Sequence, residues 1–333
     1  GAQAVERARD GVRVQVDRWV APEMRGPDAR LTRLVDAGRA HLPHVLEELD
    51  AMADAAGVQR WQLYHLNFPR FGGELKVDDA HDEGCTNVVF SETPDGPVWG
   101  KNNDGEAPDR RRPACIKLLY PADGLPVMMV THCGMVAVMD GMNAEGLCVG
   151  HSSVGSRFQQ SDEHVGVRLW SYEAMRRCRT TRDFVRFMAD RPTRGKGYAG
   201  VAVDRRGVTT AFEAPCPLFQ VRRPSSLRGT YCTNCYREPA VAEADRRTPE
   251  GKADALARAA YLDRLFDGDT PLGAEAMQTL LRRHGDADGP GLCRHARTQV
   301  FHTEYSTIGL PARGVLLHAS GYPCASAYDE GSL

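Results

Sequence analysis

Cys85 is the residue whose surroundings best suit chemistry. It opens a β-patterned run in EGCTNVVF, and Lys101 and Asp104 follow in the sequence GKNND. A turn at residues 94–96 would fold the two runs into a hairpin and return Lys101 and Asp104 to the side of Cys85. A cation beside a thiol lowers its pKa and favours the thiolate, which is the nucleophile. The spacing therefore favours nucleophilic catalysis, although a lone cysteine at a strand start is more often a structural thiol.

The neighbours of Cys85 fit the same interpretation. Gly84 allows a close approach of backbone or ligand and would suit a peptide bond that is cut before Cys85. Thr86 places a hydroxyl at the same strand edge. The alternative is that Lys101 and Asp104 form only a surface ion pair at the end of the hairpin.

Asn234 is a second candidate. It lies in YCTNC, at the end of a strand-like run. A side-chain amide at such a position can donate to the oxyanion of a tetrahedral intermediate, and the loss of one such donor costs about 2.7–4 kcal/mol of transition-state stabilisation. An asparagine in an ordinary turn is the alternative.

A structural zinc site is an alternative role for several of the cysteines. Cys232 and Cys235 have zinc-ligand spacing, and Cys293 with His295 could complete four ligands. The second pair lies far along the chain on a different kind of element, whereas zinc knuckles usually hold both pairs locally. We therefore expect no metal and no other cofactor.

Composition limits the class of protein. The 333 residues are 42% hydrophobic and 26% charged, which is typical of a globular protein with a core. The net charge of −2 predicts neither nucleic-acid nor membrane partners. The ten cysteines are spread along the chain and indicate reduced thiols in a cytoplasmic protein.

The hydrophobic pattern predicts helices first and groups of strands after Cys85. Apolar residues recur at helical spacing over residues 42–57, and a polar, glycine-rich connector follows at 71–84. Further helices are expected at 250–267 and 273–284, and a helical block at 168–190 in which Thr180 or Thr181 restarts the helix. Single strands and helices do not alternate strictly, so we expect antiparallel sheets layered with helices rather than a parallel doubly wound fold.

Together these motifs resemble the N-terminal-nucleophile hydrolases. The resemblance is to the branch of the acyl-coenzyme A:isopenicillin N acyltransferases, with the choloylglycine (bile-salt) hydrolases and acid ceramidase as relatives. It rests on motifs that occur in the family's order along most of the chain: LEELDAMADAAGV, EGCT, GKNND, DGMNAEGLCVG, CTNC, LLRRHGDADGPGLCRH and ASGYPC.

The resemblance implies a fold and a domain division. The fold would be an α+β four-layer αββα sandwich of two antiparallel sheets. Residues 1–84 would form a helical region similar to a pro-segment, and residues 85–333 the catalytic domain. The bond between Gly84 and Cys85 would be cut by the chain itself.

The resemblance also implies catalytic roles. Cys85 would be the nucleophile, and its freed α-amino group, with an ordinary pKa of ~7.7–8.0, the general base. Asp104 would contact that amine, and Asn234 would be the oxyanion donor. Lys101 stands where relatives often carry Arg, which loses a planar fork of donors. If the chain stays whole, Asp104 or a nearby histidine would have to take the thiol proton.

The resemblance also implies where the substrate pocket lies. Beside Thr86, it implies that the backbone from the N-x-x-G-L turn onwards lines the pocket, with Asn143, His151 and Ser153 as binding residues. Bile-salt hydrolases have an Asn where this chain reads HSS. They also carry a helix Arg near the site; Lys252 and Arg258 lie in the corresponding helix, but neither aligns cleanly with it.

The function expected is that of a cysteine amidase acting on a small N-acylated amine, amino acid or peptide. Transfer of the acyl group to an amine or thiol acceptor uses the same acyl-enzyme and stays open. So do a non-catalytic binding protein on this fold and assembly into a homo-oligomer.

Overall fold

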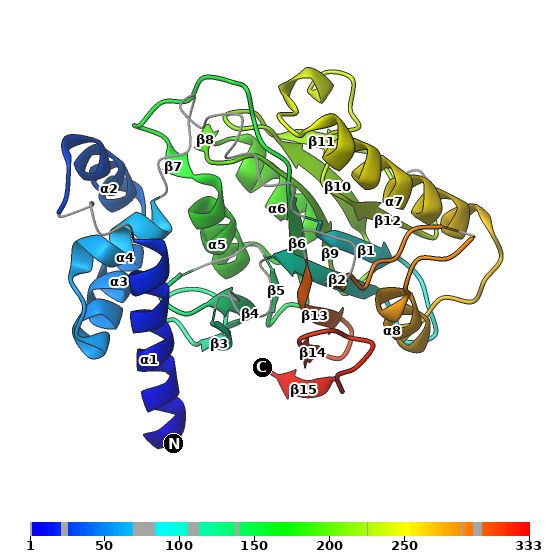
Figure 1. The fold of residues 1–333 in the computed structure, drawn as a ribbon, viewed down its shortest axis with the longest axis horizontal. Helices are drawn as coiled ribbons and strands as arrows, with labels where there is room; N and C mark the ends of the chain where they lie inside the picture. The colour runs from blue at the N-terminus through cyan, green and yellow to red at the C-terminus, as the bar shows by residue number, and fades with distance from the viewer. Residues whose placement is uncertain are drawn as a thin grey trace.

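The computed structural model describes residues 2–20, 26–68, 84–105, 113–136, 140–224, 226–287, 289–295 and 302–333. Two antiparallel sheets form its centre (Figure 1). The first has the strand order β12-β1-β2-β13-β14-β15, with bounds Gly229–Cys232, Thr86–Phe90, Val98–Gly105, His302–Leu310, Val315–Ser320 and Asp329–Ser332.

The second sheet has seven strands. Its order is β11-β10-β9-β6-β5-β4-β3, with bounds Gln220–Arg222, Thr209–Ala214, Tyr198–Val203, Cys148–Ser153, Gly141–Asn143, Val127–His132 and Ala114–Leu119. A separate short parallel pair joins β7 (Val165–Gly166) to β8 (Thr193–Arg194).

Helices cover the outer face of each sheet. α7 (Pro249–Asp267) and α8 (Ala274–Arg282) share a hydrophobic cluster with the first sheet. α5 (Val167–Arg177) and α6 (Thr181–Ala189) share another with the second sheet. A third cluster fills the space between the sheets. The expected four-layer αββα sandwich is therefore confirmed.

Strand alternation assigns each side chain of β1 and β2 to one of two layers. Val88 and Phe90 pack under the helices, whereas Val89 and Trp99 pack between the sheets. Successive side chains of a strand point to opposite faces, and directly paired residues share a face. In the register of β1 with β2, Asn87 lies opposite Lys101 and Thr86 opposite Asn102.

The N-terminal region is helical, as expected. It contains α1 (Ala2–Trp19), α2 (Ala29–His41), α3 (Pro43–Ala56) and α4 (Arg60–Asn67). These helices belong to the same hydrophobic cluster as α5, α6 and the second sheet. Polar contacts add to this packing, since Tyr172 donates to Glu48 at 2.7 Å and Asn67 donates to the Gly134 carbonyl at 2.8 Å. The division at residue 84 stays a prediction.

Several element predictions can be compared with the structure. The helical block at 168–190 restarts where expected, because the Thr180 side chain accepts a hydrogen bond from the Asp183 N–H and caps α6. β15 was not expected. The connector expected at 71–84 lies outside the described residues except for Gly84.

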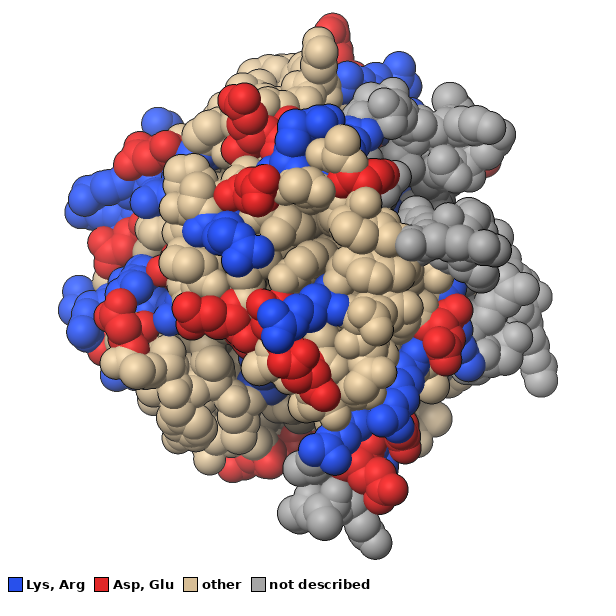
Figure 2. Space-filling model, turned by 90° about the vertical axis from the view of Figure 1, so that its left-hand side faces the viewer, with Lys and Arg blue, Asp and Glu red and all other residues tan. Residues whose placement is uncertain are grey.

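The charges are mixed on the face that carries the N-terminal helices. Lys and Arg side chains lie between Asp and Glu side chains there, without a large area of one sign among the described residues (Figure 2). None of the described helices is both long and apolar enough to cross a bilayer.

Candidate active site

Cys85 lies immediately before β1 and is 4% exposed. The hairpin brings the end of β2 to its side, so that the Asp104 backbone N–H donates to Cys85 Sγ at 3.4 Å. Asn103 Oδ1 lies 3.8 Å from the same sulfur. The predicted return of Asp104 to Cys85 therefore occurs, through the backbone of Asp104 and the side chain of its neighbour.

The Asp104 carboxylate is buried and only partly satisfied. Oδ1 accepts a hydrogen bond of 2.7 Å from Thr303, and Oδ2 lies 3.7 Å from Arg294 Nε. Burial raises the pKa of Asp104 to about 6, although Arg294 and Thr303 act in the opposite direction. Oδ2 accepts no hydrogen bond from any described residue.

Gly84 fits tightly against this carboxylate. A Cβ atom at this position would collide with the Arg294 guanidinium and lie 2.9 Å from Asp104 Oδ2. No larger residue fits without moving one of these two buried groups. Gly84, whose carbonyl forms the peptide bond to Cys85, therefore lies directly beside Asp104 Oδ2.

Arg258 is the buried centre of the site. It projects from α7 and is fully buried. Its Nη1 donates to the Cys85 carbonyl at 2.7 Å and to Thr86 Oγ1 at 2.9 Å, and its Nη2 donates to Asn234 Oδ1 at 3.0 Å. Asp254, one turn earlier, accepts from both Arg258 and Arg294. These contacts join Cys85, Thr86, Asn234 and Asp104 into one network.

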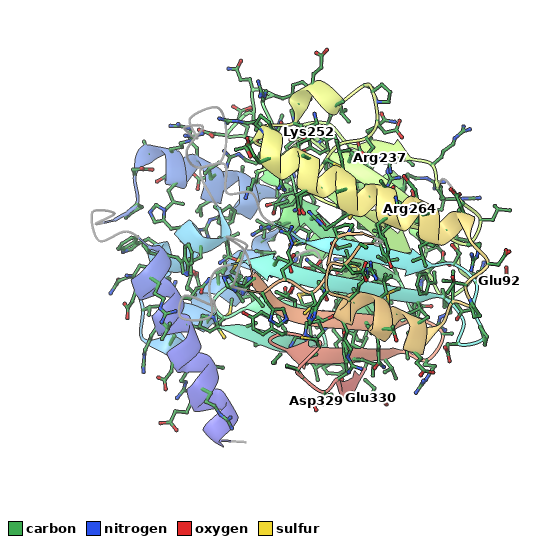
Figure 3. The ribbon with its side chains drawn as sticks, turned by 45° about the vertical axis from the view of Figure 1, so that its right-hand side comes forward. Glu92, Arg237, Lys252, Arg264, Asp329 and Glu330 are labelled. Carbon is green, nitrogen blue, oxygen red and sulfur yellow. The ribbon has the colours of Figure 1, made fainter. Side chains whose placement is uncertain are left out.

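Sequence reasoning could not choose between Lys252 and Arg258. The buried face of α7 includes Gly251, Ala255, Arg258 and Leu262, so the helical period was the signal that separates them. Lys252 lies off this face, near the start of α7 at the outer edge of the molecule (Figure 3).

Asn234 is buried beside Arg258. Its Nδ2 donates to the Ser153 carbonyl at 2.7 Å, while Oδ1 faces Arg258. The neighbouring Ser152 hydroxyl donates to the Cys85 carbonyl at 3.3 Å. The end of β6 is thereby fixed to the start of β1, which brings Ser153 close to the nucleophile through its backbone.

Lys101 belongs to a different network, between the sheets. Its Nζ lies 2.5 Å from Asp140 Oδ2, and Asp140 Oδ1 accepts from the His151 backbone N–H and lies 3.0 Å from His151 Nδ1. Burial opposes the charge on Asp140, but His151 and Lys101 together hold its pKa below the usual range. Burial lowers the pKa of His151 to about 4. The alternative of a surface Lys101–Asp104 ion pair is wrong, because both side chains are buried and pair elsewhere.

Asn143 is used for structure. Its Nδ2 donates to the carbonyls of Met175 and Cys178 at 2.8 Å each, and its Oδ1 accepts from the Leu147 N–H at 3.1 Å. These bonds tie the turn between β5 and β6 to the C-terminal end of α5. The structure does not bring the Asn143 side chain into either network around the hairpin.

Tyr305 was missed by sequence reasoning. It lies on β13 opposite Asn103, and its side chain is buried. No described residue hydrogen-bonds its hydroxyl. Burial, and then the charges of Asp140 and Glu304, raise the pKa of the phenol well above its ordinary value, which keeps it a neutral donor. A tyrosine in a strand pattern carries no signal of this kind in the sequence.

The four zinc ligands considered from the sequence, two from the Cys232 pair and two from the Cys293 pair, do not come together. Cys232 packs between the sheets, and its thiol donates to Ser152. Within the described residues, the group of potential ligands that contains Cys293 and His295 includes neither Cys232 nor Cys235.

No protein-family model matches the sequence, and no curated protein matches it. Solved structures do. A variant of the conjugated bile acid hydrolase from Clostridium perfringens is 10% identical, with a TM-score of 0.50 over 75% of this chain and 97% of that chain. Penicillin V acylase from Agrobacterium tumefaciens is 13% identical, with a TM-score of 0.48 over 71% and 83%. The Caenorhabditis elegans ortholog of N-acylethanolamine-hydrolyzing acid amidase is 11% identical, with a TM-score of 0.47 over 68% and 93%. At such identity, the likeness to the bile acid hydrolase shows a shared fold.

Proposed function

We propose that this protein is a cysteine amidase that forms an acyl-enzyme on Cys85. The observation that carries the proposal is the position of Cys85 at the start of β1, with Arg258 on its carbonyl and Asp104 against the preceding glycine. The likeness to the conjugated bile acid hydrolase supports a hydrolytic reaction.

Asp104 is suited to act as the base in the cleavage of the bond between Gly84 and Cys85. Cys85 Sγ would attack the Gly84 carbonyl, the thiol proton would pass to Asp104, and Asp104 would return it to the departing nitrogen of Cys85. Water would then hydrolyse the Gly84 thioester. A carboxylate with a pKa of about 6 is a competent base near neutral pH. Its free Oδ2 would accept a hydrogen bond from the new amine.

The matured site would then cleave an external amide. The α-amine of Cys85 takes the thiol proton as Sγ attacks the acyl carbon, and Asn234 Nδ2 donates to the oxyanion. Breaking the C–N bond releases the amine, which takes that proton. Water attacks the thioester, releases the acid and restores the thiol. An amine or thiol acceptor in place of water would make the same site an acyltransferase.

Intact mass spectrometry tests the processing step. We expect two polypeptides, residues 1–84 and 85–333, that separate under denaturing conditions. They should elute together under native conditions, because the N-terminal helices share a core with the second sheet. The Cys85→Ala variant should remain one chain. A wild-type chain that stays whole and is active would refute the processing step but not the nucleophile.

Incubation with N-acyl amines, N-acyl amino acids and short acyl peptides tests the reaction. Acid quenching followed by peptide mapping should find the acyl group on Cys85. Adding an amine or thiol acceptor separates hydrolysis from transfer by the product formed.

A further inference from the structure

We propose that His284, Cys293, His295 and Cys324 form a tetrahedral zinc site, which fixes Arg294 against the active site. One ligand atom from each of the four side chains lies within 4.8 Å of the others. His295 Nε2 lies 3.4 Å from Cys293 Sγ and 3.1 Å from Cys324 Sγ. The four residues come from three separate segments, so their convergence is not a local sequence effect.

The distances suit a single small ion. Zinc bonds of ~2.3 Å to sulfur and ~2.0 Å to nitrogen place tetrahedral sulfur and nitrogen ligands about 3.5 Å apart. The distances from His295 Nε2 to the two sulfurs, 3.4 and 3.1 Å, lie within about 0.4 Å of this value. Two thiolates with two imidazoles are a donor set that favours zinc and leaves no open position for a substrate.

Neighbouring aromatic rings orient the ligands. The Tyr322 ring stacks on His295 at 4.0 Å between centroids, and its hydroxyl lies 3.0 Å from His302 Nδ1. The His284 ring meets His295 edge-on at 4.8 Å. Such outer contacts commonly fix the ring of a metal-binding histidine.

The site joins loops that lack regular structure. His284 follows the end of α8, Cys293 and His295 lie between α8 and β13, and Cys324 follows β14. The described backbone bonds of this segment include those from Leu292 and Cys293 to the Arg283 carbonyl, both 2.9 Å. A metal would add a link that joins all three of these loops.

Arg294 connects this cluster to the nucleophile. It lies between two proposed ligands and is buried. Its guanidinium pairs with Asp254 and Asp104 and limits position 84 to glycine. A metal held by its two neighbours would therefore fix the backbone from which this guanidinium reaches the site.

Zinc content tests the site independently of activity, so its failure is distinct from that of the proposed amidase. The full chain is purified under reducing conditions from zinc-supplemented medium and measured by elemental mass spectrometry. We expect about one zinc per chain. Cys324→Ser and His284→Ala change exposed residues and should lower the content at least tenfold, while Cys115→Ser, outside the cluster, should not.

Cobalt replacement gives a second measurement. Bound cobalt should show tetrahedral visible bands and thiolate charge-transfer bands that Cys324→Ser weakens. Wild-type protein without zinc and without these cobalt bands would overturn the proposal. So would a Cys293–Cys324 disulfide that persists in the folded protein under reducing conditions, found by peptide mapping.

Discussion

The two faces of the β1–β2 hairpin carry different buried charge networks. On the helix side, Arg258 and Arg294 both pair with Asp254. Arg294 also lies beside Asp104, and Arg258 donates to the Cys85 carbonyl. Between the sheets, Asp140 pairs with both Lys101 and His151. Lys101 and Asp104 are three residues apart on one strand, so alternation sends them to opposite faces. Residues near each other in a motif need not form one site.

The two networks also respond to pH in opposite directions. Burial dominates at Asp104 and raises its pKa to about 6. At Asp140 the neighbouring Lys101 and His151 prevail over burial and lower the pKa. The helix-side network therefore holds a carboxylate that can exchange a proton near neutral pH, whereas the network between the sheets holds a fixed ion pair.

Replacing Arg258 should have the largest effect on stability. The Arg258→Met variant would leave Asp254 and the Cys85 carbonyl without this donor, which we expect to lower the free energy of unfolding by about 3–5 kcal/mol. Activity should fall with it. Urea unfolding measures the effect, and Lys252→Met on the same helix is the matched control, with a change within about 0.5 kcal/mol. Equal effects of the two variants would remove Arg258 from the centre of the site.

Asn234 should affect the rate more than the fold. In Asn234→Ala, kcat should fall about 10²–10³-fold if the amide donates to the oxyanion. Asn102→Ala is the control, because that buried amide bonds only to the Leu281 and Leu292 carbonyls among its described contacts. It should lower stability and leave kcat within about threefold. A similar loss of kcat in both variants would make Asn234 a structural residue.

Replacing Lys101 should affect stability but not the reactivity of Cys85. Lys101→Met leaves Asp140 buried without its cation, so we expect a loss of stability of about 3 kcal/mol. The labelling rate of Cys85 by iodoacetamide in the folded variant should change less than about threefold, because Asp140 already offsets the charge of Lys101. A much slower labelling rate would show that Lys101 activates the thiol and that the two faces act together.

The pH response is the smallest effect expected. The folded-state pKa of Asp104 lies above its unfolded value of 3.8, so the folded state binds more protons between pH 4 and 6. Its contribution to stability is therefore present below this window and is lost as the pH rises through about 6. Asp104→Asn should remove this loss. Asp140 has the opposite sign, and its contribution is lost as the pH falls through and below 3.8. Urea unfolding of wild type and Asp104→Asn from pH 4 to 7 should diverge with rising pH; parallel curves would contradict the assignment.

Much of the fold could be predicted from the sequence, because the hydrophobic period distinguishes helices from strands and turn residues mark where strands pair as hairpins. The hairpin after Cys85 is the clearest example. The partners of Lys101 could not be predicted, since Asp140 reaches it from the other sheet. The sequence did not decide between Lys252 and Arg258 as the basic residue of α7 near the site. The buried face of that helix, which includes Arg258 and not Lys252, separates the two. The grouping of Cys324 with His284 depends on where loops return, which no local pattern records.

The most direct test of the account is peptide mapping of the acid-quenched enzyme after incubation with the acyl amide panel. We predict an acyl group on Cys85 in wild type, and neither acyl group nor product with Cys85→Ala. Product formation by Cys85→Ala at the wild-type rate, with no acyl group on Cys85 of the wild type, would contradict the central claim.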